Sequence, residues 1–437
     1  MNLTKEQQEI YDGKQGATLA KVMQTLVRYG ELFGADKMVP VTSKYNHLVT
    51  SFGLKALAPV YELMNQLIES GNVSKQKFSA DPRPLDPNVP SSFLQDFVFK
   101  NFMYSKQDDY EKQLTQLGIM EKDAYTCTCY MDEVGNTPAM GEVLSWSESS
   151  AVVYANSVLG ARCNRNSGII DLMGSVVGYV PHFGLLTDEG RKATWIVKIE
   201  TTKKPEAQLL GSAIGMKVMA DVPYIVGLDK WLGGELDDAA KTYLKDFGAA
   251  TASNGAVGLY HVENITPEAV KYGKDLISED AKVYVVDDAE LQRVYESYPV
   301  IWKKKDAKPK LCFMGCPHMS LQQLIDWTEK VSQSLKEAGR TRVCIPTVFT
   351  AAPAVLKKFQ ETPYAEALKA TGVITSYICP LMYMNNPLSE KMPVITSSNK
   401  LRTYTSARYY TDAEILEQIT NCLLYTSPSP RDISGSR

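Results

Sequence analysis

The first third of the chain repeats apolar side chains three and four positions apart, which is the period of an amphipathic α-helix. Four segments share this spacing: residues 4–13, 17–33, 93–102 and 108–117. The apolar run at residues 38–42 predicts a short strand, whereas the proline-rich run at residues 79–92 predicts a loop, because proline removes backbone donors. The amino-terminal part should therefore be largely helical.

From about residue 209 the pattern changes to short apolar runs separated by helical periods. The runs typical of buried strands are residues 222–228, 255–262, 282–287, 310–315, 342–349 and 372–379. A helical period over residues 320–338 lies between two of them. Because alternating strands and helices favour doubly wound layers, we predict an α/β fold class of three-layer α/β/α units with mostly parallel sheets.

The lysine-rich segment at residues 302–310 is polar and interrupted by proline, as expected of a solvated linker, and we place an internal boundary there. A chain of 437 residues favours two to three domains. We therefore divide the chain into a first region over residues 1–205, an α/β domain over residues 206–301 and a second α/β region over residues 302–421.

The last segment, residues 422–437, departs abruptly from the amphipathic helix predicted over residues 412–421. Its start, CLLYTSPSPRD, back-translates into a transposase sequencing adapter, so we expect residues 422–437 to be a non-native tail. Few core-forming residues and two prolines should leave it disordered, with Cys422 binding no metal. A disordered regulatory tail with proline-flanked serines is the alternative.

Composition narrows the class of protein. A net charge of −3 gives no basic footprint for nucleic acid or for an anionic membrane. Residues 1–16 are too polar for a signal peptide, and no apolar run approaches the roughly 18 residues of a membrane helix. The eight cysteines should then be reduced thiols. We expect a cytoplasmic protein without a nucleic-acid or membrane partner.

The segment with the most candidate site residues spans residues 126–165. A short β-like run carries Cys127 and Cys129, and a turn rich in Gly, Asn and Pro follows it. Ser145 and Glu148 have capping-box spacing, which predicts the start of a helix. Seven-residue spacing along that helix would place Ser149, Asn156 and Cys163 on one polar stripe.

Short neutral side chains rarely fill the exposed face of a surface helix. This stripe should therefore face something polar and buried, or else pack at a tight helix crossing.

Two further cysteines, Cys316 and Cys379, are each followed by proline at the end of an apolar run. Sites gather at strand ends in α/β folds, and a Cys-Pro step is compatible with cluster ligation. Together with Cys127, they supply three thiols from distant segments. Structural zinc usually shows two C-x2-4-C pairs, whereas the local pairs here are Cys127-x-Cys129 and Cys312-x3-Cys316. An iron–sulfur centre, an awkward zinc site and inert buried thiols therefore remain open. His318 could be a ligand, a proton shuttle or a core histidine.

Other common signatures are absent from the sequence. There is no G-x-x-x-x-G-K-[ST] phosphate loop, no G-x-G-x-x-G between a strand and a helix, and no G-x-S-x-G elbow. The sequence therefore does not indicate a P-loop nucleoside triphosphatase, a dinucleotide-dependent enzyme or an ordinary serine hydrolase.

The segment at residues 127–165, with ESSAVVYANSVLGAR at its centre, resembles the signature of the large, catalytic subunit of the aconitase X family. The resemblance covers about the first 421 residues. It includes LTKEQQEIYDGKQG, VPVTS, FMGCPHMSLQQL and SSNKLRTY, at residues 3–16, 39–43, 313–324 and 397–404. It implies an aconitase-like, multi-domain fold and a hydro-lyase.

The resemblance also implies a cofactor and its ligands. An iron–sulfur cluster (4Fe-4S or 2Fe-2S) would be held by Cys127, Cys316 and Cys379, and an iron left open would stabilise the departing hydroxide as a Lewis acid.

The same resemblance implies substrate contacts for a small hydroxylated carboxylate. Arg162 and Arg165 become candidate carboxylate clamps, with a salt bridge at a helix end as the alternative. Ser149, Asn156 and Lys400 would add hydrogen bonds or charge.

Two substrates follow from the family. We expect cis-3-hydroxy-L-proline ahead of mevalonate 5-phosphate, because no obvious basic cluster suited to a phosphate accompanies the two arginines. Cys129, Cys163 and Lys400 depart from the family pattern, which weakens the choice of substrate but not the cluster ligands.

The chain should also need a partner. A small swivel-domain subunit would dock over the cleft near Cys127 and Lys400 and supply a serine base. The rival hypothesis from another class is a non-catalytic, zinc- or cluster-bearing structural subunit.

Overall fold

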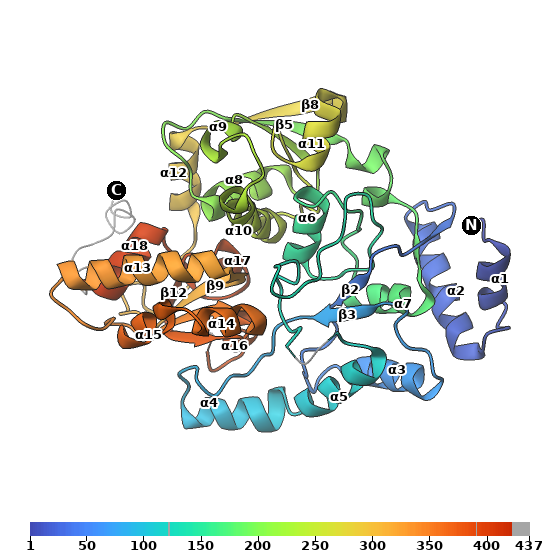
Figure 1. The fold of residues 1–437 in the computed structure, drawn as a ribbon, viewed down its shortest axis with the longest axis horizontal. Helices are drawn as coiled ribbons and strands as arrows, with labels where there is room; N and C mark the ends of the chain where they lie inside the picture. The colour runs from blue at the N-terminus through green and yellow to red at the C-terminus, as the bar shows by residue number, and fades with distance from the viewer. Residues whose placement is uncertain (121–122, 390, 422–437) are drawn as a thin grey trace.

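The computed structural model describes residues 1–120, 123–389 and 391–421. In Figure 1 the amino-terminal elements extend from the right along the bottom, a first α/β unit lies at the top and a second α/β unit lies at the left. Almost all strand pairs are parallel, so the predicted fold class is confirmed. The predicted non-native tail, residues 422–437, lies outside the described residues.

Helices dominate the amino-terminal region, as its apolar spacing predicts. The first helix begins at a capping box in which the side chains of Thr4 and Gln7 bond each other's backbone N–H groups. The second buries Val22, Met23 and Leu26 on one face. The helices of this region are α1 (Lys5–Tyr11), α2 (Ala17–Leu32), α3 (Ala58–Glu69), α4 (Phe93–Val98), a π-helical turn η1 (Phe99–Met103), α5 (Gln107–Leu117), α6 (Ser149–Ser157) and α7 (Gly168–Val177).

Two small strand pairs complete this region. They are β1 (Met38–Pro40) antiparallel to β4 (Tyr179–Pro181), and β2 (Tyr45–Leu48) parallel to β3 (Lys77–Ala80). Tyr125 forms an isolated bridge with Ala80, the last residue of β3. The loop that carries Cys127 therefore runs beside the carboxyl end of β3, where Asp81 follows.

The first α/β unit is a parallel sheet with the strand order β7-β6-β5-β8. Two of its helices, α8 and α10, pack very closely at Gly211. A Cβ added at Gly211 would lie 2.4 Å from the Phe247 carbonyl oxygen, so only glycine fits there. Its strands are β5 (Ala193–Ile199), β6 (Pro223–Val226), β7 (His261–Val262) and β8 (Ile277–Val286). Its helices are α8 (Ala207–Val218), α9 (Asp229–Leu232), α10 (Asp238–Asn254), α11 (Pro267–Tyr272) and α12 (Asp288–Ser297).

The second α/β unit is a parallel sheet with the order β11-β10-β9-β12-β13, and β9 lies at its centre. Apolar side chains of β9 are buried against helices on both faces. The strands are β9 (Leu311–Met319), β10 (Thr347–Ala351), β11 (Ile374–Ser376), β12 (Val394–Thr396) and β13 (Arg408–Tyr409). The helices are α13 (Leu321–Glu337), α14 (Pro353–Gln360), α15 (Pro363–Ala370), α16 (Pro380–Met384), α17 (Asn399–Tyr404) and α18 (Asp412–Thr420).

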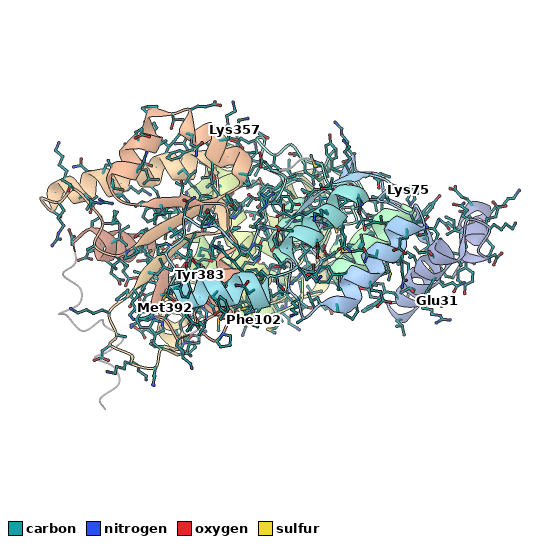
Figure 2. All side chains as sticks on the ribbon, turned by 90° about the horizontal axis from the view of Figure 1, so that it is seen from below. Glu31, Lys75, Phe102, Lys357, Tyr383 and Met392 are labelled. Atoms are coloured by element: carbon teal, nitrogen blue, oxygen red, sulfur yellow. The ribbon has the colours of Figure 1, made fainter. Side chains whose placement is uncertain are left out.

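The amino-terminal region packs directly against this second unit. The Tyr104 hydroxyl donates to the Met382 carbonyl oxygen at 2.7 Å, and the rings of Phe99 and Tyr383 pack edge to face with centroids 5.8 Å apart. Figure 2 shows the helix bearing Phe102 beside Tyr383. Residues far apart in the sequence therefore meet next to α16.

The structure corrects the predicted helix in the segment at residues 126–165. The N-cap of α6 is Glu148 rather than Ser145, and Cys163 lies beyond the end of the helix, so the predicted stripe does not include it. Ser145 instead donates to the Asp171 carbonyl oxygen at 2.8 Å. Residues 150–157 are all buried, which is compatible both with a stripe that faces a buried polar space and with packing at a helix crossing.

Two strand predictions also change. The run that carries Cys127 and Cys129 forms bends and turns instead of a strand, and β5 was not among the predicted runs. None of the helices in the described ranges is both long and apolar enough to cross a membrane.

Candidate functional site

The three cysteines predicted as ligands come from three separate segments and line one small cavity. Cys316 lies within β9, Cys379 is the N-cap of α16, and Cys127 lies in the loop beside β3. The cavity has a volume of about 50 Å³. Other side chains that line it are Phe52, Asp81, Glu148, His318 and Lys400.

The surroundings of these thiols favour their neutral form. Burial raises the pKa of Cys127, Cys316 and Cys379, and the Lys400 ammonium opposes this in each case. Buried thiolates there would need a further positive centre beside them. Among the described residues, no group of three or more His, Cys, Asp or Glu side chains has the arrangement of a metal site.

A buried ion pair forms part of the cavity wall. The Lys400 ammonium contacts the Glu148 carboxylate and donates to Ser150 Oγ at 2.6 Å. Burial alone would raise the pKa of Glu148 and lower that of Lys400, but their mutual attraction outweighs it, so the pKa of Glu148 is lowered and that of Lys400 is raised. Both groups are therefore charged at neutral pH.

A second carboxylate, Asp81, faces the same cavity. Burial raises its pKa to about 6, against the opposing effect of the neighbouring His47. The two side chains approach to 3.6 Å between His47 Nε2 and Asp81 Oδ1, and His47 Nδ1 lies 2.9 Å from Ser79 Oγ. Asp81 is thus the cavity carboxyl that can exchange a proton near neutral pH.

An open cleft of about 320 Å³ adjoins the cavity, and Glu148 lines both spaces. Ser149, Arg165 and Asn166 line the cleft as well. Arg165 Nη1 is buried and has no hydrogen-bond partner among the described residues, and burial lowers the pKa of this guanidinium. A buried donor without a partner favours an incoming anion, since leaving it unpaired costs free energy.

The structure does not bring the other two predicted substrate contacts, Asn156 and Arg162, into the cleft. The Asn156 amide donates to the Cys163 and Gly258 carbonyl oxygens, each at 2.8 Å. Arg162 donates to the Leu186 carbonyl oxygen at 2.9 Å and forms an ion pair with Asp188. The alternative of a salt bridge near a helix end therefore describes Arg162.

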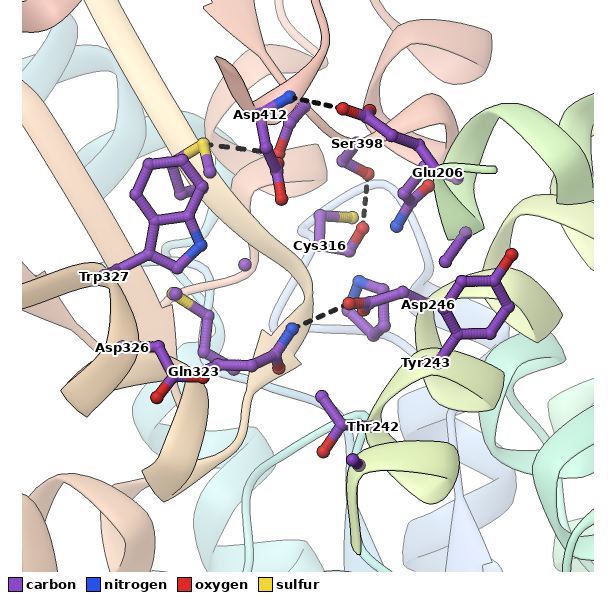
Figure 3. Close-up of a pocket in the computed structure, with 18 of the residues that line it drawn as sticks. Glu206, Thr242, Tyr243, Asp246, Cys316, Gln323, Asp326, Trp327, Ser398 and Asp412 are labelled. Atoms are coloured by element: carbon purple, nitrogen blue, oxygen red, sulfur yellow. Dashed lines mark hydrogen bonds between the residues drawn. The ribbon is translucent and has the colours of Figure 1, made fainter. Parts of the chain in front are cut away.

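A larger cavity, with a volume of about 450 Å³, lies between α8, α10 and α13, and Cys316 forms part of its lining. Figure 3 shows Ser398, which donates to the Cys316 carbonyl oxygen, and Gln323, which donates to Asp246 at 2.7 Å. Its lining includes the carboxylates Glu206, Asp246, Asp326 and Asp412. Lys204 and Lys330 line the same cavity, so its lining carries both signs of charge.

Comparison with known proteins agrees with this arrangement. The family model of the aconitase X first domain matches residues 1–189, and that of the aconitase X second domain matches residues 193–296. The chain belongs to the aconitase X family. The predicted resemblance is confirmed.

Individual aconitase X relatives extend the match. The phosphomevalonate dehydratase large subunit of Thermococcus kodakarensis is 32% identical over 86% of each chain. The cis-3-hydroxy-L-proline dehydratase of Hypocrea jecorina is 26% identical over 74% of this chain and 52% of its own length. The crystal structure of Thermococcus kodakaraensis aconitase X in its holo-form has a TM-score of 0.77 at 28% identity, covering 96% of this chain and 100% of that one.

These relatives are dehydratases, and this aconitase X chain is a hydro-lyase, as predicted. The non-catalytic alternative finds no support among them.

Sequence reasoning missed Asp81 and Glu148 as site residues. Asp81 lies in the proline-rich run that we interpreted only as a loop, although its place directly after a strand was a usable signal. Glu148 was interpreted only as a capping residue. Its φ of 94°, which is unusual for a residue other than glycine, cannot be recognised before the structure is known.

Proposed function

We propose that this chain is the large subunit of a dehydratase that acts on mevalonate 5-phosphate. The observation that supports this choice of substrate is the match to the Thermococcus kodakarensis phosphomevalonate dehydratase large subunit over 86% of both chains. The cis-3-hydroxy-L-proline dehydratase of Hypocrea jecorina is less similar and matches over 52% of its length. The order of the two substrates is therefore the reverse of the one expected from the sequence.

In this proposal Cys127, Cys316 and Cys379 hold an iron–sulfur cluster. Their common cavity supports it, and so does the need of buried thiolates for a positive partner. The cluster supplies a Lewis acid that stabilises hydroxide as it leaves the substrate. Cys316 and Cys379 are only 7% and 8% exposed, so the chain's own residues exclude water from these two sulfurs, whereas Cys127 is partly exposed.

The Arg165 cleft would hold the anionic end of the substrate. Its unpaired Nη1 supports this role, since a guanidinium binds a carboxylate or a phosphate through two parallel hydrogen bonds. Ser149 lines the same cleft and adds a hydroxyl. Lys400 is already paired with Glu148, so its role would be to hold Glu148 in place at the cleft rather than to clamp the substrate itself.

The proposed enzyme also contains a small subunit, because the Thermococcus relative is named a large subunit. We place this partner over the cleft near Cys127 and Lys400, where it would supply the serine base expected from the sequence analysis. Among the described residues the Arg165 cleft is open, so a second chain is suited to closing it.

The test uses the chain purified anaerobically, reconstituted with iron and sulfide, and assayed with and without its small subunit. Loss of water from mevalonate 5-phosphate is measured beside loss of water from cis-3-hydroxy-L-proline. We expect turnover of the phosphate only, and only with both chains present. Turnover of the proline but not the phosphate would refute the proposed substrate, and full activity of the single chain would refute the need for a partner.

A further inference from the structure

A single imidazole connects the segments that carry the three cysteines. His318 Nδ1 lies 2.9 Å from Thr126 Oγ1, and Thr126 directly precedes Cys127. His318 Nε2 lies 3.0 Å from the carbonyl oxygen of Ile378, which directly precedes Cys379. The side chain of His318 is completely buried, so water does not compete for these contacts.

The backbone of His318 adds a third connection. It follows Cys316 by two positions, and its N–H donates to Cys127 Sγ at 3.4 Å. Its carbonyl oxygen accepts from the fully buried Lys245 ammonium at 3.1 Å, and Lys245 is paired with Asp246 at 2.7 Å. The residue is therefore fixed both to the cysteine segments and to α10.

The chemistry of the partners gives each hydrogen bond one direction. A carbonyl oxygen only accepts, so His318 Nε2 carries the proton that is donated to Ile378. Nδ1 of a neutral imidazole must then accept, and the Thr126 hydroxyl donates to it. The same hydroxyl accepts from the Thr128 N–H at 3.1 Å, so donors and acceptors match along the whole chain of bonds.

We infer that His318 is a positioning residue that holds the three cysteine segments in register to bind the iron–sulfur cluster. This inference rests on the proposed function, which assigns the cluster to Cys127, Cys316 and Cys379. Three segments from distant parts of the chain each lose conformational freedom when their sulfurs converge, and a shared side chain removes that freedom beforehand. Groups that orient metal ligands from behind typically change metal affinity by about 10–100-fold when they are replaced.

The structure provides a matched control. His261 is also buried, at 1% exposure, and its Nε2 lies 2.8 Å from the Arg191 carbonyl oxygen. It lies on β7 of the first α/β unit and lines neither the cysteine cavity nor the Arg165 cleft. Replacing it tests what the loss of any buried histidine does to the protein.

The experiment compares His318→Leu with His261→Leu and the wild-type chain after anaerobic reconstitution. Iron per chain, the visible absorption spectrum and the rate of iron transfer to an added chelator are measured, with circular dichroism as the check on folding. We expect iron loss from His318→Leu to be about 10–100-fold faster than from the wild type. The His261→Leu protein should lose iron at the wild-type rate.

Milder variants separate positioning from folding. His318→Gln keeps a donor where Nε2 was, and Thr126→Val removes only the hydroxyl that bonds Nδ1, so each should give an intermediate rate. These two variants carry the test if His318→Leu does not fold. Folded variants that keep iron as long as the wild type overturn the positioning role alone. A wild-type chain that takes up no iron overturns the proposed cluster as well.

Discussion

The ammonium group of Lys400 and the carboxylate of Glu148 form a buried ion pair between residues 252 positions apart in the chain. Their side chains are 6% and 8% exposed. The pair joins the first turn of α17 to the N-cap of α6, and Glu148 lines both the cysteine cavity and the Arg165 cleft. One interaction therefore supports the wall between the two spaces.

Removing one partner of this pair should destabilise the protein strongly. We expect Lys400→Met to lower the free energy of unfolding by about 3–5 kcal/mol, because it leaves a buried carboxylate without its counter-charge. The double variant Glu148→Gln with Lys400→Met should recover part of that loss but no dehydratase activity. Urea unfolding followed by circular dichroism measures the stability of both variants, and a dehydratase assay measures their activity.

The control for this prediction is Lys369→Met. Lys369 is 78% exposed in its ion pair with Glu366, so its loss should change the unfolding free energy by less than about 1 kcal/mol. Equal effects of the two lysine variants would contradict a special role for the buried pair.

Each proposed ligand should be needed for full iron content. Serine at Cys127, Cys316 or Cys379 should lower the iron bound after anaerobic reconstitution, since serine replaces a soft thiolate ligand by a hydroxyl. The matched control is Cys312→Ala, which changes a buried cysteine on the same strand as Cys316 that does not line the cavity. Full iron content in all three serine variants would exclude the assignment.

Arg165 and Arg162 should differ in their effect on substrate binding. We expect Arg165→Met to raise KM for mevalonate 5-phosphate at least ~10-fold, a difference of about 1.4 kcal/mol, because an unpaired buried donor is lost from the cleft. Arg162→Met should change KM little, since that side chain is held by Leu186 and Asp188. Steady-state kinetics of the chain together with its proposed small subunit measure KM for both variants. A larger rise in KM for Arg162→Met than for Arg165→Met would assign the substrate contact to Arg162 instead.

Acid should destabilise the fold through His261. Burial lowers the pKa of His261 to about 4, below the value of about 6.5 in the unfolded chain. As the pH falls below about 6.5, the unfolded state binds the proton first, so stability is complete above that pH and is lost towards pH 4. The loss should be on the order of 3 kcal/mol.

The measurement is urea unfolding at pH 7 and at pH 4.5, for the wild type and for His261→Gln. The variant has no titrating group at this position and should lose correspondingly less stability between the two pH values. The same loss in both proteins would show that other groups account for the acid sensitivity.

Much of the fold could be predicted because the relevant signals are local. The parallel strands β6 and β9 are largely apolar runs, and α13 has a clear helical period with a capping box at Ser320 and Gln323. The three proposed cysteine ligands were suggested by apolar runs and by the family signature, although Cys316 lies within β9 rather than at its end and Cys127 lies in a loop. Their meeting in one cavity depends on the packing of regions that no local pattern describes.

The wrong or incomplete predictions concern side chains whose partners lie far away in the sequence. Asn156 is a polar residue on a helix, and only the fold reveals that Gly258 and Arg191 occupy its hydrogen-bonding groups. Arg162 likewise forms an ion pair with Asp188, which lies 26 positions further along the chain. β5 was also missed, although its sequence, ATWIVKI, is mostly apolar.

The spread of the three thiols along the chain also determines when the centre can be assembled. Cys127 is synthesised early, but Cys379 and Lys400 leave the ribosome only after most of the chain has been made. Until then the nascent protein carries reduced sulfurs without the neighbours that later bury them. For the proposed cluster, iron and sulfide would then be delivered after translation, and oxidants that reach the chain earlier would act on the same three sulfur atoms.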